Sequence, residues 1–384
     1  VQTVFMSDIY NYMKDGVLLR QVINLVDGLE LDDYKERHAF GEIYETLLKS
    51  LQSAGNAGEY YTPRAVTDFM AWAINPRLGE RVADFACGTG GFLTSSLKRL
   101  NTQVKTTKDK GLYDHSVYGI EVKQLPYILC LTNMLLHDID EPEIYHTNSL
   151  VKNVRDYEEK DRFPIIMMNP PYGGSEKSEE KDNFPVELRS SETADLFIDV
   201  IMYRLKKKGR AAVIIPDGFL FGVDNAKRSI KEKLFGEFDV HTVLRMPGSV
   251  FSPYTSITTN IIFFENTHPT VETWFYRLDM PEGFKHFSKT KPMEFGHFQP
   301  AMDWWNDRKE IKDDEGDGWK AKRYSIDELK ARNFDIDLCG YPKHEEVILS
   351  PGETMQNYIE KRSSLNEKID EKLDELKKLL EMPS

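Results

Sequence analysis

The feature that most narrows the possible folds is an apolar run that leads into a cluster of glycines. Residues 82–84 predict a buried strand that ends in Asp84, and Gly88, Gly90 and Gly91 predict a turn before an apolar helix. Glycines in such a turn let a ligand approach the backbone closely. The turn lacks the Gly-Lys-Ser/Thr of a phosphate-binding loop, and its third glycine comes too early for the dinucleotide pattern Gly-x-Gly-x-x-Gly. The segment therefore predicts a ligand-binding strand–turn–helix unit of another kind.

A second predicted strand, residues 116–121, ends in a carboxylate. An acid at the tip of the second strand is placed to bind both hydroxyls of a ribose, so Glu121 is the predicted ribose ligand. The alternative is a nucleotide-binding dehydrogenase, but Glu121 lies about thirty residues beyond the glycines, where that class has about twenty. A polar insertion over residues 101–115 accounts for the extra length.

The tetrapeptide Asn-Pro-Pro-Tyr, residues 169–172, follows another apolar run, residues 163–168. A conjugated exocyclic amine is a poor nucleophile, and both the Asn169 side-chain oxygen and the Pro170 carbonyl can accept its protons as positive charge develops. The prolines stiffen the turn, and Tyr172 offers a flat face on which a flipped base can stack. The pattern indicates methyl transfer to a planar nitrogen; the alternative is an ordinary loop after a strand.

A third motif, Gly-Glu-Tyr-Tyr-Thr-Pro-Arg at residues 58–64, predicts a helix start. Thr62 is a suitable N-cap and Pro63 a suitable first helical residue. A helix N-terminus binds anions, so it could receive the carboxylate of the methionine half of S-adenosylmethionine. The alternative is an ordinary capped helix.

These three motifs, in this order, resemble an adenine-specific DNA methyltransferase of the amino type. Within that group, the chain resembles the modification subunit of type I restriction-modification systems over roughly residues 40–340. Supporting segments are Gly-Glu-Ile-Tyr-Glu at 41–45, Thr-Ala-Asp-Leu-Phe-Ile at 193–198, Gly-Arg-Ala-Ala-Val-Ile-Ile-Pro at 209–216, Leu-Arg-Met-Pro-Gly-Ser-Val-Phe at 244–251 and Asn-Ile-Ile-Phe-Phe at 260–264.

The resemblance implies both a cofactor site and a catalytic site. The cofactor is S-adenosylmethionine, and no metal is required. Asn148 stands where many relatives have an acid that touches the cofactor's adenine, and an asparagine oxygen can still accept that bond. The expected cofactor-binding residues are Glu59, Tyr60, Tyr61, Thr62, Pro63, Arg64, Asp84, Gly88, Thr89, Gly90, Gly91, Glu121 and Asn148. The expected catalytic residues are Asn169, Pro170, Pro171 and Tyr172.

The charge balance is unusual for a DNA enzyme, since 63 acidic against 50 basic residues give a net charge of −13 over 384 residues. DNA-binding proteins usually carry a basic surface, so another protein should hold the DNA. The basic stretch at residues 204–210 predicts a helix C-terminus rather than a phosphate groove. The resemblance implies a specificity subunit that reads double-stranded DNA and two copies of this chain per specificity subunit, which a restriction subunit can join.

Cysteine content predicts a cytoplasmic protein, and the resemblance implies a prokaryotic cell. The three cysteines are scattered without a Cys-x-x-Cys pair, which suits a reducing compartment and argues against a zinc site. No apolar stretch approaches the length of a membrane span.

The element pattern predicts an α/β fold, a Rossmann-like, doubly wound and mainly parallel sheet with ligands at the carboxyl ends of its strands. Helices are expected at residues 34–51, 125–137 and 195–207, and a strand at 211–215. Residues 251–259 could form a loop near the target base, and residues 267–341 carry no functional prediction. The expected domains are 1–57, the end of a truncated N-terminal helical domain; 58–345, the catalytic domain; and 346–384, a C-terminal helix.

The C-terminal segment predicts a long amphipathic helix. Its apolar residues recur at helical spacing, and the last of them step by four, three and four as in a coiled coil. The helix either packs on its own domain or docks on a partner, and docking is the interpretation preferred here. The apolar residues are Met355, Ile359, Leu365, Ile369, Leu373, Leu376 and Leu380.

The sequence thus predicts an enzyme that transfers a methyl group from S-adenosylmethionine to the N6 amino group of adenine in DNA. One alternative keeps this chemistry but acts on RNA bases or on protein glutamine. The other is a non-catalytic scaffold in a DNA-binding assembly, which would predict decay of the motifs, whereas both the glycine turn and the Asn-Pro-Pro-Tyr motif are intact.

Overall fold

The structure is a computed structural model. It describes residues 14–27, 44, 62–252, 255, 257–288, 290–314 and 318–341, together with positions 352, 355, 356, 358, 359, 362, 363, 365, 366, 369, 370, 372 and 373 of a helix near the C-terminus. The chain divides into two compact units, Val1–Tyr341 and Pro342–Ser384. The predicted helix at residues 34–51 lies outside the described residues except for Tyr44, which is helical.

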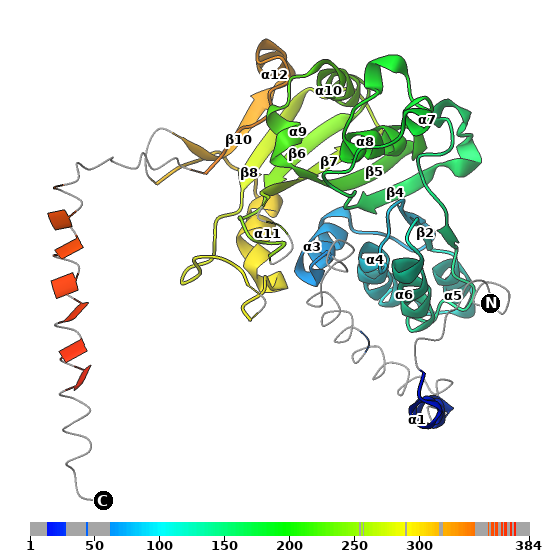
Figure 1. The fold of residues 1–384 in the computed structure, drawn as a ribbon. Coiled ribbons are helices and arrows are strands. Elements are labelled where there is room, and N and C mark those ends of the chain that lie inside the picture. The colour runs from blue at the N-terminus through cyan, green and yellow to red at the C-terminus, as the bar shows by residue number, and fades with distance from the viewer. Residues whose placement is uncertain are drawn as a thin grey trace, which may run out of the picture. The chain divides into compact units, whose positions relative to one another are not determined.

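One mixed sheet of ten strands organises the described part of the first unit (Figure 1). The strand order is β3-β2-β1-β4-β5-β7-β6-β8-β10-β9, so the first strand along the chain lies inside the sheet. The strands are β1 Val82–Asp84, β2 Val117–Glu121, β3 Ile144–His146, β4 Phe163–Met168, β5 Leu205–Pro216, β6 Asp239–Arg245, β7 Thr259–Glu265, β8 Glu272–Arg277, β9 Ile311–Lys312 and β10 Trp319–Ser325.

Helices connect and cover these strands. The α-helices are α1 Gly16–Asp27, α3 Arg64–Ile74, α4 Gly91–Asn101, α5 Thr107–Asp114, α6 Gln124–Leu135, α7 Ser178–Lys181, α8 Thr193–Arg204, α9 Asp217–Phe221, α10 Asn225–Glu237, α11 Gln299–Asn306 and α12 Ile326–Ala331. Short 3-10 helices are η2 Val154–Asp156, η3 Glu159–Asp161, η4 Val186–Leu188 and η5 Phe295–Phe298.

The five strands from β3 to β5 are mutually parallel. Val82 pairs with Val117 of β2 and with Ile165 of β4, which places β1 between them. Parallel strands end at the same edge of a sheet. The residues that follow β1, β2 and β4 therefore lie together at its carboxyl edge. This edge holds the glycine turn, Glu121 and the Asn-Pro-Pro-Tyr segment.

Beyond β5 the sheet is mixed. β7 runs antiparallel to β5 and β6, β8 pairs parallel with β6, and β10 adds antiparallel to β8. Strands β8, β9 and β10 come from residues 267–341, the region without a functional prediction. They extend the predicted parallel core into a larger sheet.

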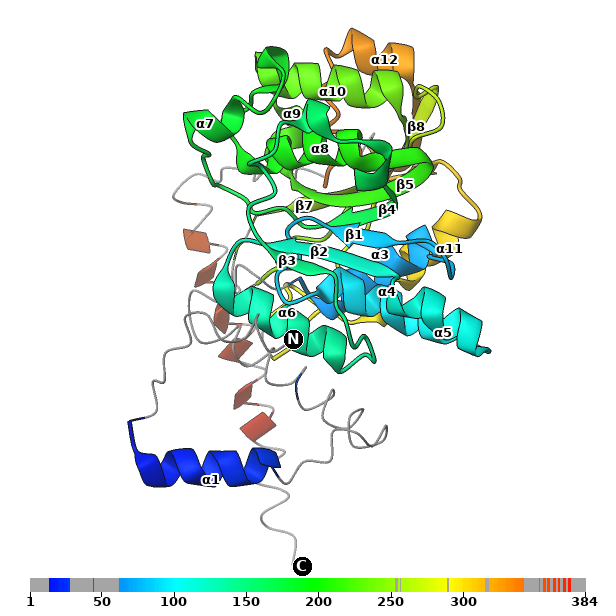
Figure 2. The ribbon, with the colours of Figure 1, turned by 90° about the vertical axis from the view of Figure 1, so that its right-hand side faces the viewer.

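Helices cover both faces of the sheet (Figure 2). Alternate side chains of a strand face opposite sides of the sheet, so the core has two parts. Ala83, Ile166 and Val213 pack with α8 and α10 on one side. Val82 and Ile165 pack with α3 and α11 on the other. A third cluster lies among α4, α5 and α6 around Leu97. Because both faces are buried, the central strands are continuously apolar, as expected for a parallel sheet.

One predicted element boundary is wrong. The helix predicted over residues 195–207 ends at Arg204, and β5 begins at the next residue. The lysines of the basic stretch therefore lie at the start of a strand, at the amino edge of the sheet, where Leu205 pairs with Phe163. Lys208 has φ 62° and precedes Gly209, and a register shift in the pairing of β4 with β5 falls in this part of the strand. The predicted helix at residues 125–137 corresponds to α6.

Candidate active site

The glycine turn after β1 requires its glycines. Gly88 and Gly90 have φ of 54° and 84°, in the left-handed region that favours glycine. A Cβ on Gly90 would lie 2.9 Å from the Cys130 sulfur, and one on Gly91 would lie 2.7 Å from Arg64 Nη1. Helix α4 begins directly after this turn, so its N-terminal N–H groups point to the carboxyl edge of the sheet and can bind an anion.

Two buried carboxylates lie beside the turn. Glu121 accepts hydrogen bonds from the N–H groups of Gly88 (2.9 Å) and Lys123 (2.7 Å), and Asp84 accepts one from Ala86 (3.0 Å). Burial raises the pKa of Asp84 to about 8, and it raises that of Glu121 against the opposing effect of the backbone N–H groups. Each Glu121 oxygen retains a lone pair for a further donor, which is the requirement for a ribose ligand.

The loop after β3 is attached to the same edge. The Ser149 hydroxyl donates to the Phe85 carbonyl at 2.6 Å, and the Asn148 side-chain oxygen accepts from the N–H of Leu150 at 2.9 Å. Asn148 is half-buried. Its amide is thereby held near the end of β1, as a residue that contacts the cofactor's adenine would require.

The start of α3 differs from the prediction in one respect. The helix begins at Arg64 and Pro63 occupies the N-cap position without a side-chain cap, so Thr62 is not the N-cap. The Thr62 hydroxyl instead accepts a hydrogen bond from Asn169 Nδ2 at 3.1 Å. Arg64 lies against Gly91, so the first turns of α3 and α4 are neighbours.

The Asn-Pro-Pro-Tyr segment leaves β4 at the same edge. Asn169 is half-buried, Pro170 is buried and Pro171 is exposed. The Tyr172 hydroxyl donates to Asn169 Oδ1, and burial raises the pKa of Tyr172 well above its usual value. The tyrosine is therefore a neutral hydroxyl donor, and its side chain packs against the apolar cluster that contains α3.

Direct contacts thus join motifs that lie far apart in the sequence. Thr62 binds Asn169, Arg64 contacts Gly91, and Gly88 binds Glu121. Glu59, Tyr60 and Tyr61 lie outside the described residues, so their expected roles stay predictions. The expected placement of residues 251–259 near the target base also stays a prediction.

Sequence reasoning missed two polar residues that support the turn. Asn133 is buried on α6 and its Nδ2 donates to the Thr89 carbonyl at 3.0 Å, and Ser149 ties the neighbouring loop to Phe85. The signal for Asn133 was present, because it is a polar residue on an otherwise apolar helical face.

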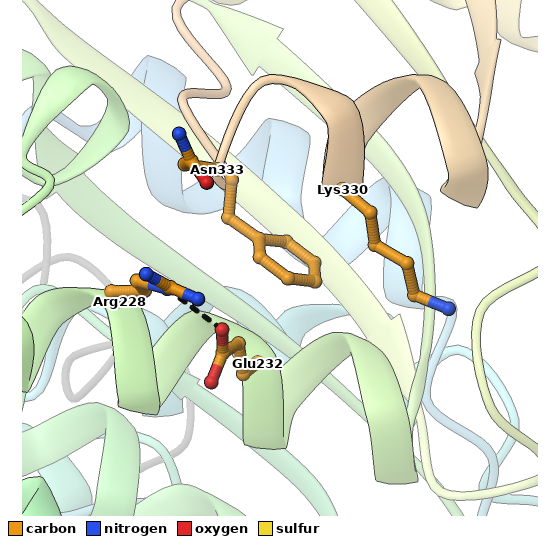
Figure 3. A pocket seen from close by; sticks show the side chains of 5 residues that line it. Arg228, Glu232, Lys330 and Asn333 are labelled. Atoms are coloured by element: carbon orange, nitrogen blue, oxygen red, sulfur yellow. Dashed lines mark hydrogen bonds and ion pairs between the residues drawn. The ribbon is translucent and has the colours of Figure 1, made fainter.

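A separate pocket of about 320 Å³ lies between α10 and α12 (Figure 3). Its lining residues are Arg228, Glu232, Lys330, Asn333 and Phe334, with an Arg228–Glu232 hydrogen bond of 2.8 Å at one side. None of them belongs to the predicted site. Within the described residues, no group of three His, Cys, Asp or Glu side chains could hold a metal ion, and no helix is long and apolar enough to cross a membrane.

Comparisons with known proteins agree with this geometry. The chain matches the N-6 DNA Methylase family model over residues 35–348. It is 46% identical, over 94% of its length and 74% of the relative's, to the type I restriction enzyme EcoEI methylase subunit of Escherichia coli. It is 26% identical, over 94% of its length and 68% of the relative's, to the type I restriction enzyme MpnII methylase subunit of Mycoplasma pneumoniae.

Solved structures give the same result. A modification subunit from Vibrio vulnificus YJ016, assigned to a type I restriction enzyme, has a TM-score of 0.77 and 41% identity, covering 85% of this chain and 68% of its own. A chain from a structural study of type I R-M complex assembly has a TM-score of 0.80 and 31% identity, and the match covers 100% of this chain and 79% of the other.

The parallel sheet, the glycine turn and the Asn-Pro-Pro-Tyr segment at one edge define a methyltransferase of the S-adenosylmethionine-dependent, amino-methylating class. The chain belongs to the N-6 DNA methylase family, in the group of type I methylase subunits. The predicted fold class and the predicted activity, adenine-specific DNA methylation as a type I modification subunit, are confirmed by these similarities.

Proposed function

We propose that the carboxyl edge of β1, β2 and β4 is the methyl-transfer site and that Asn169 receives the target amino group. The observation that carries this proposal is the position of Asn169, which follows β4 next to β1 and its glycine turn, with its amide oriented by hydrogen bonds on both sides. S-adenosylmethionine supplies an electrophilic methyl group there.

The cofactor-side residues act by binding. The N–H groups at the starts of α3 and α4 attract the cofactor's carboxylate, Glu121 accepts from the ribose hydroxyls, and Asn148 contacts the adenine. Within the described residues, Asp84 and Glu121 form no ion pair, although both are buried. A cationic sulfonium bound nearby would lower the raised pKa of both carboxyl groups, because a positive charge favours their ionised form.

The acceptor-side residues act on the amine. Asn169 Oδ1 and the Pro170 carbonyl accept its protons, which localises the nitrogen lone pair towards the methyl donor. Tyr172 stacks on the flipped adenine after its hydroxyl leaves Asn169. The proton then passes by way of Asn169 and Pro170 to water. No metal takes part in this scheme.

The partners are those that the family resemblance implies, and the net charge of −13 and the C-terminal helix support them. A specificity subunit holds and reads the double-stranded DNA, two copies of this chain serve each specificity subunit, and a restriction subunit can join them in the prokaryotic cytoplasm. The apolar residues of the C-terminal segment, including Ile359, Leu365, Ile369 and Leu373, recur at helical spacing, which supports docking on a partner. The proposed division is a helical segment at 1–57, a catalytic domain at 58–345 and a docking helix at 346–384.

The experiment compares two asparagine variants in the complex with the specificity subunit. Asn169→Ala should lower kcat for labelled methyl transfer into DNA adenine by about a hundredfold or more, because a transition-state hydrogen bond is lost, while S-adenosylmethionine still binds. The matched control is Asn266→Ala, which removes a buried asparagine that bonds the Leu205 carbonyl at the other edge of the sheet and should retain kcat.

Each other outcome has a defined meaning. Unchanged turnover of Asn169→Ala with intact cofactor binding would refute the proposed mechanism. RNA and protein are offered as competing acceptors in the same assay, and label in RNA bases or in glutamine would assign the activity to them instead of DNA.

A further inference from the structure

A hydrogen bond joins the start of α3 to the end of β4. Asn169 Nδ2 donates to Thr62 Oγ1 at 3.1 Å, across 107 residues of sequence. Thr62 is half-buried and does not cap α3, because Pro63 holds the N-cap position. Its hydroxyl is therefore available to orient the Asn169 amide.

The orientation of this amide matters because its two ends are chemically opposite. The oxygen accepts hydrogen bonds, whereas the NH₂ group only donates them. An exocyclic amine that must lose a proton can donate a hydrogen bond only to Oδ1. If the NH₂ group of Asn169 were turned towards the amine, two hydrogen-bond donors would face each other. A 180° rotation of the amide would therefore convert an attraction into a repulsion.

Two contacts hold the two ends of the Asn169 amide. Thr62 accepts from Nδ2 on one side, and the Tyr172 hydroxyl donates to Oδ1 on the other. Both partners are hydroxyls, which can donate or accept, so these bonds fix the plane of the amide, and the target amine, as a donor, selects Oδ1. When a base displaces the Tyr172 hydroxyl from Oδ1, the Thr62 bond is the one that still holds the amide.

We propose that Thr62 is a positioning residue for methyl transfer, whose hydroxyl accepts from Asn169 Nδ2 and so keeps Oδ1 directed at the target amine. This inference rests on the proposed role of Asn169. It assigns Thr62 a function on the acceptor side of the site, in addition to the cofactor contact that the sequence predicts for it.

The test measures whether Thr62 changes the chemical step or cofactor binding. Thr62→Val removes the acceptor at nearly constant volume, and Thr62→Ser retains the hydroxyl. In the complex with the specificity subunit, at saturating S-adenosylmethionine and unmethylated target DNA, Thr62→Val should lower kcat five- to tenfold with Kd for the cofactor within twofold of the original protein. Thr62→Ser should recover most of that rate.

A matched control removes a threonine hydroxyl outside the site. Thr132 on α6 donates to its own helix at the Ile128 carbonyl, 3.0 Å away, so Thr132→Val should leave kcat unchanged. Thr62→Ala, which removes the same acceptor without adding bulk, replaces Thr62→Val if the valine variant fails to fold.

Coupling to Asn169 separates positioning from general disturbance. If Thr62 acts through Asn169, adding Thr62→Val to Asn169→Ala should change kcat by less than twofold in a single-turnover assay. An equal five- to tenfold loss in that background would overturn the inference. So would an unchanged kcat for Thr62→Val, or a loss confined to cofactor affinity, which would make Thr62 a cofactor contact only.

The same variants distinguish this inference from the proposed function. A fully active Asn169→Ala enzyme would refute the proposed role of Asn169 and the inference with it. An inactive Asn169→Ala enzyme together with a fully active Thr62→Val enzyme would refute the role of Thr62 alone.

Discussion

Buried ionisable side chains have different partners in the two halves of the sheet. In the parallel half, Asp84 and Glu121 are buried at strand ends and bonded to backbone N–H groups, and neither forms an ion pair within the described residues. In the mixed half, Arg245 and Arg277 are buried with carboxylates against them. Each arginine of the mixed half thus has a carboxylate partner, whereas among the described residues the two carboxyl groups at the proposed cofactor site have no cationic partner.

The largest expected effect tests the mixed half. Arg277 is paired with Asp313, bonds Asp279 Oδ1 at 2.7 Å and donates to the Gly340 carbonyl at 2.6 Å. Arg277→Met should lower the free energy of unfolding by about 3–5 kcal/mol, because it leaves Asp313 buried without its cation. Urea unfolding measures the loss.

A double variant supplies the control for that prediction. Arg277→Met with Asp313→Leu should be more stable than Arg277→Met alone, since the uncompensated carboxylate is gone. Asp279 keeps Lys320 as a partner at 2.6 Å. If Arg277→Met left the free energy of unfolding unchanged but reduced methyl transfer, Arg277 would serve the reaction rather than the fold, and the contrast between the two halves would be wrong.

The next effect tests the glycine turn of the parallel half. Gly90→Ala should cost about 1–3 kcal/mol, because alanine is strained at φ 84° and its Cβ would meet the Cys130 sulfur. It should also weaken cofactor binding, measured by calorimetry. Gly111→Ala is the matched control: Gly111 lies in α5 with no atom within 4 Å of the added Cβ, so this variant should gain about 0.5–1 kcal/mol. Equal cofactor affinity in both variants would contradict the assigned role of the turn.

A pH dependence tests the uncompensated carboxylates. The pKa of Asp84 is about 8 in the folded protein and about 4 in an unfolded chain. Between these values the folded state holds a proton that the unfolded state has lost, so the free energy of unfolding should fall as pH rises from 4 to 8, by about 1 kcal/mol per pH unit. Asp84→Asn should reduce that slope in urea titrations at pH 6 and pH 8. Parallel slopes for the two proteins would show that Asp84 is already ionised.

The smallest expected effect concerns Tyr172. Tyr172→Phe keeps the ring and removes the hydroxyl that donates to Asn169 Oδ1, so the target amine no longer has to displace it. Methyl transfer should change by less than about threefold, which corresponds to about 0.6 kcal/mol. Tyr172→Ala should reduce the rate much more, because stacking is lost. A tenfold loss in Tyr172→Phe would mean that the hydroxyl itself takes part in the reaction.

The sequence predicted the parallel half well, for a physical reason. Strands β1, β2 and β4 are short apolar runs bounded by glycine, proline or acid, and the ligands follow their carboxyl ends. The order of strands in the mixed half was not predicted, because β7 lies between β5 and β6 and β8 pairs with β6, and the residues of these strands do not specify such neighbours. Local patterns do not show which strands will become neighbours.

Two local predictions failed because tertiary contacts decided them. The lysines after Arg204 have good helix propensity and no breaker precedes them, yet β5 begins at Leu205 to pair with β4. Thr62 has the chemistry of an N-cap, yet its hydroxyl bonds Asn169. No pattern within one segment could reveal a bond between residues so far apart.

The position of β1 inside the sheet has a consequence for how the protein is made. A chain emerges from the ribosome with its N-terminal part first, so the glycine turn and Glu121 exist before β4 is synthesised. The residues of the cofactor side are thus synthesised before those of the acceptor side. The bond between Thr62 and Asn169 closes a long loop, and such closures carry an entropic cost that local contacts do not. The two sides of the site can therefore be joined only after residue 169 has been synthesised, whereas the glycine turn and Glu121 need no such distant segment to be present.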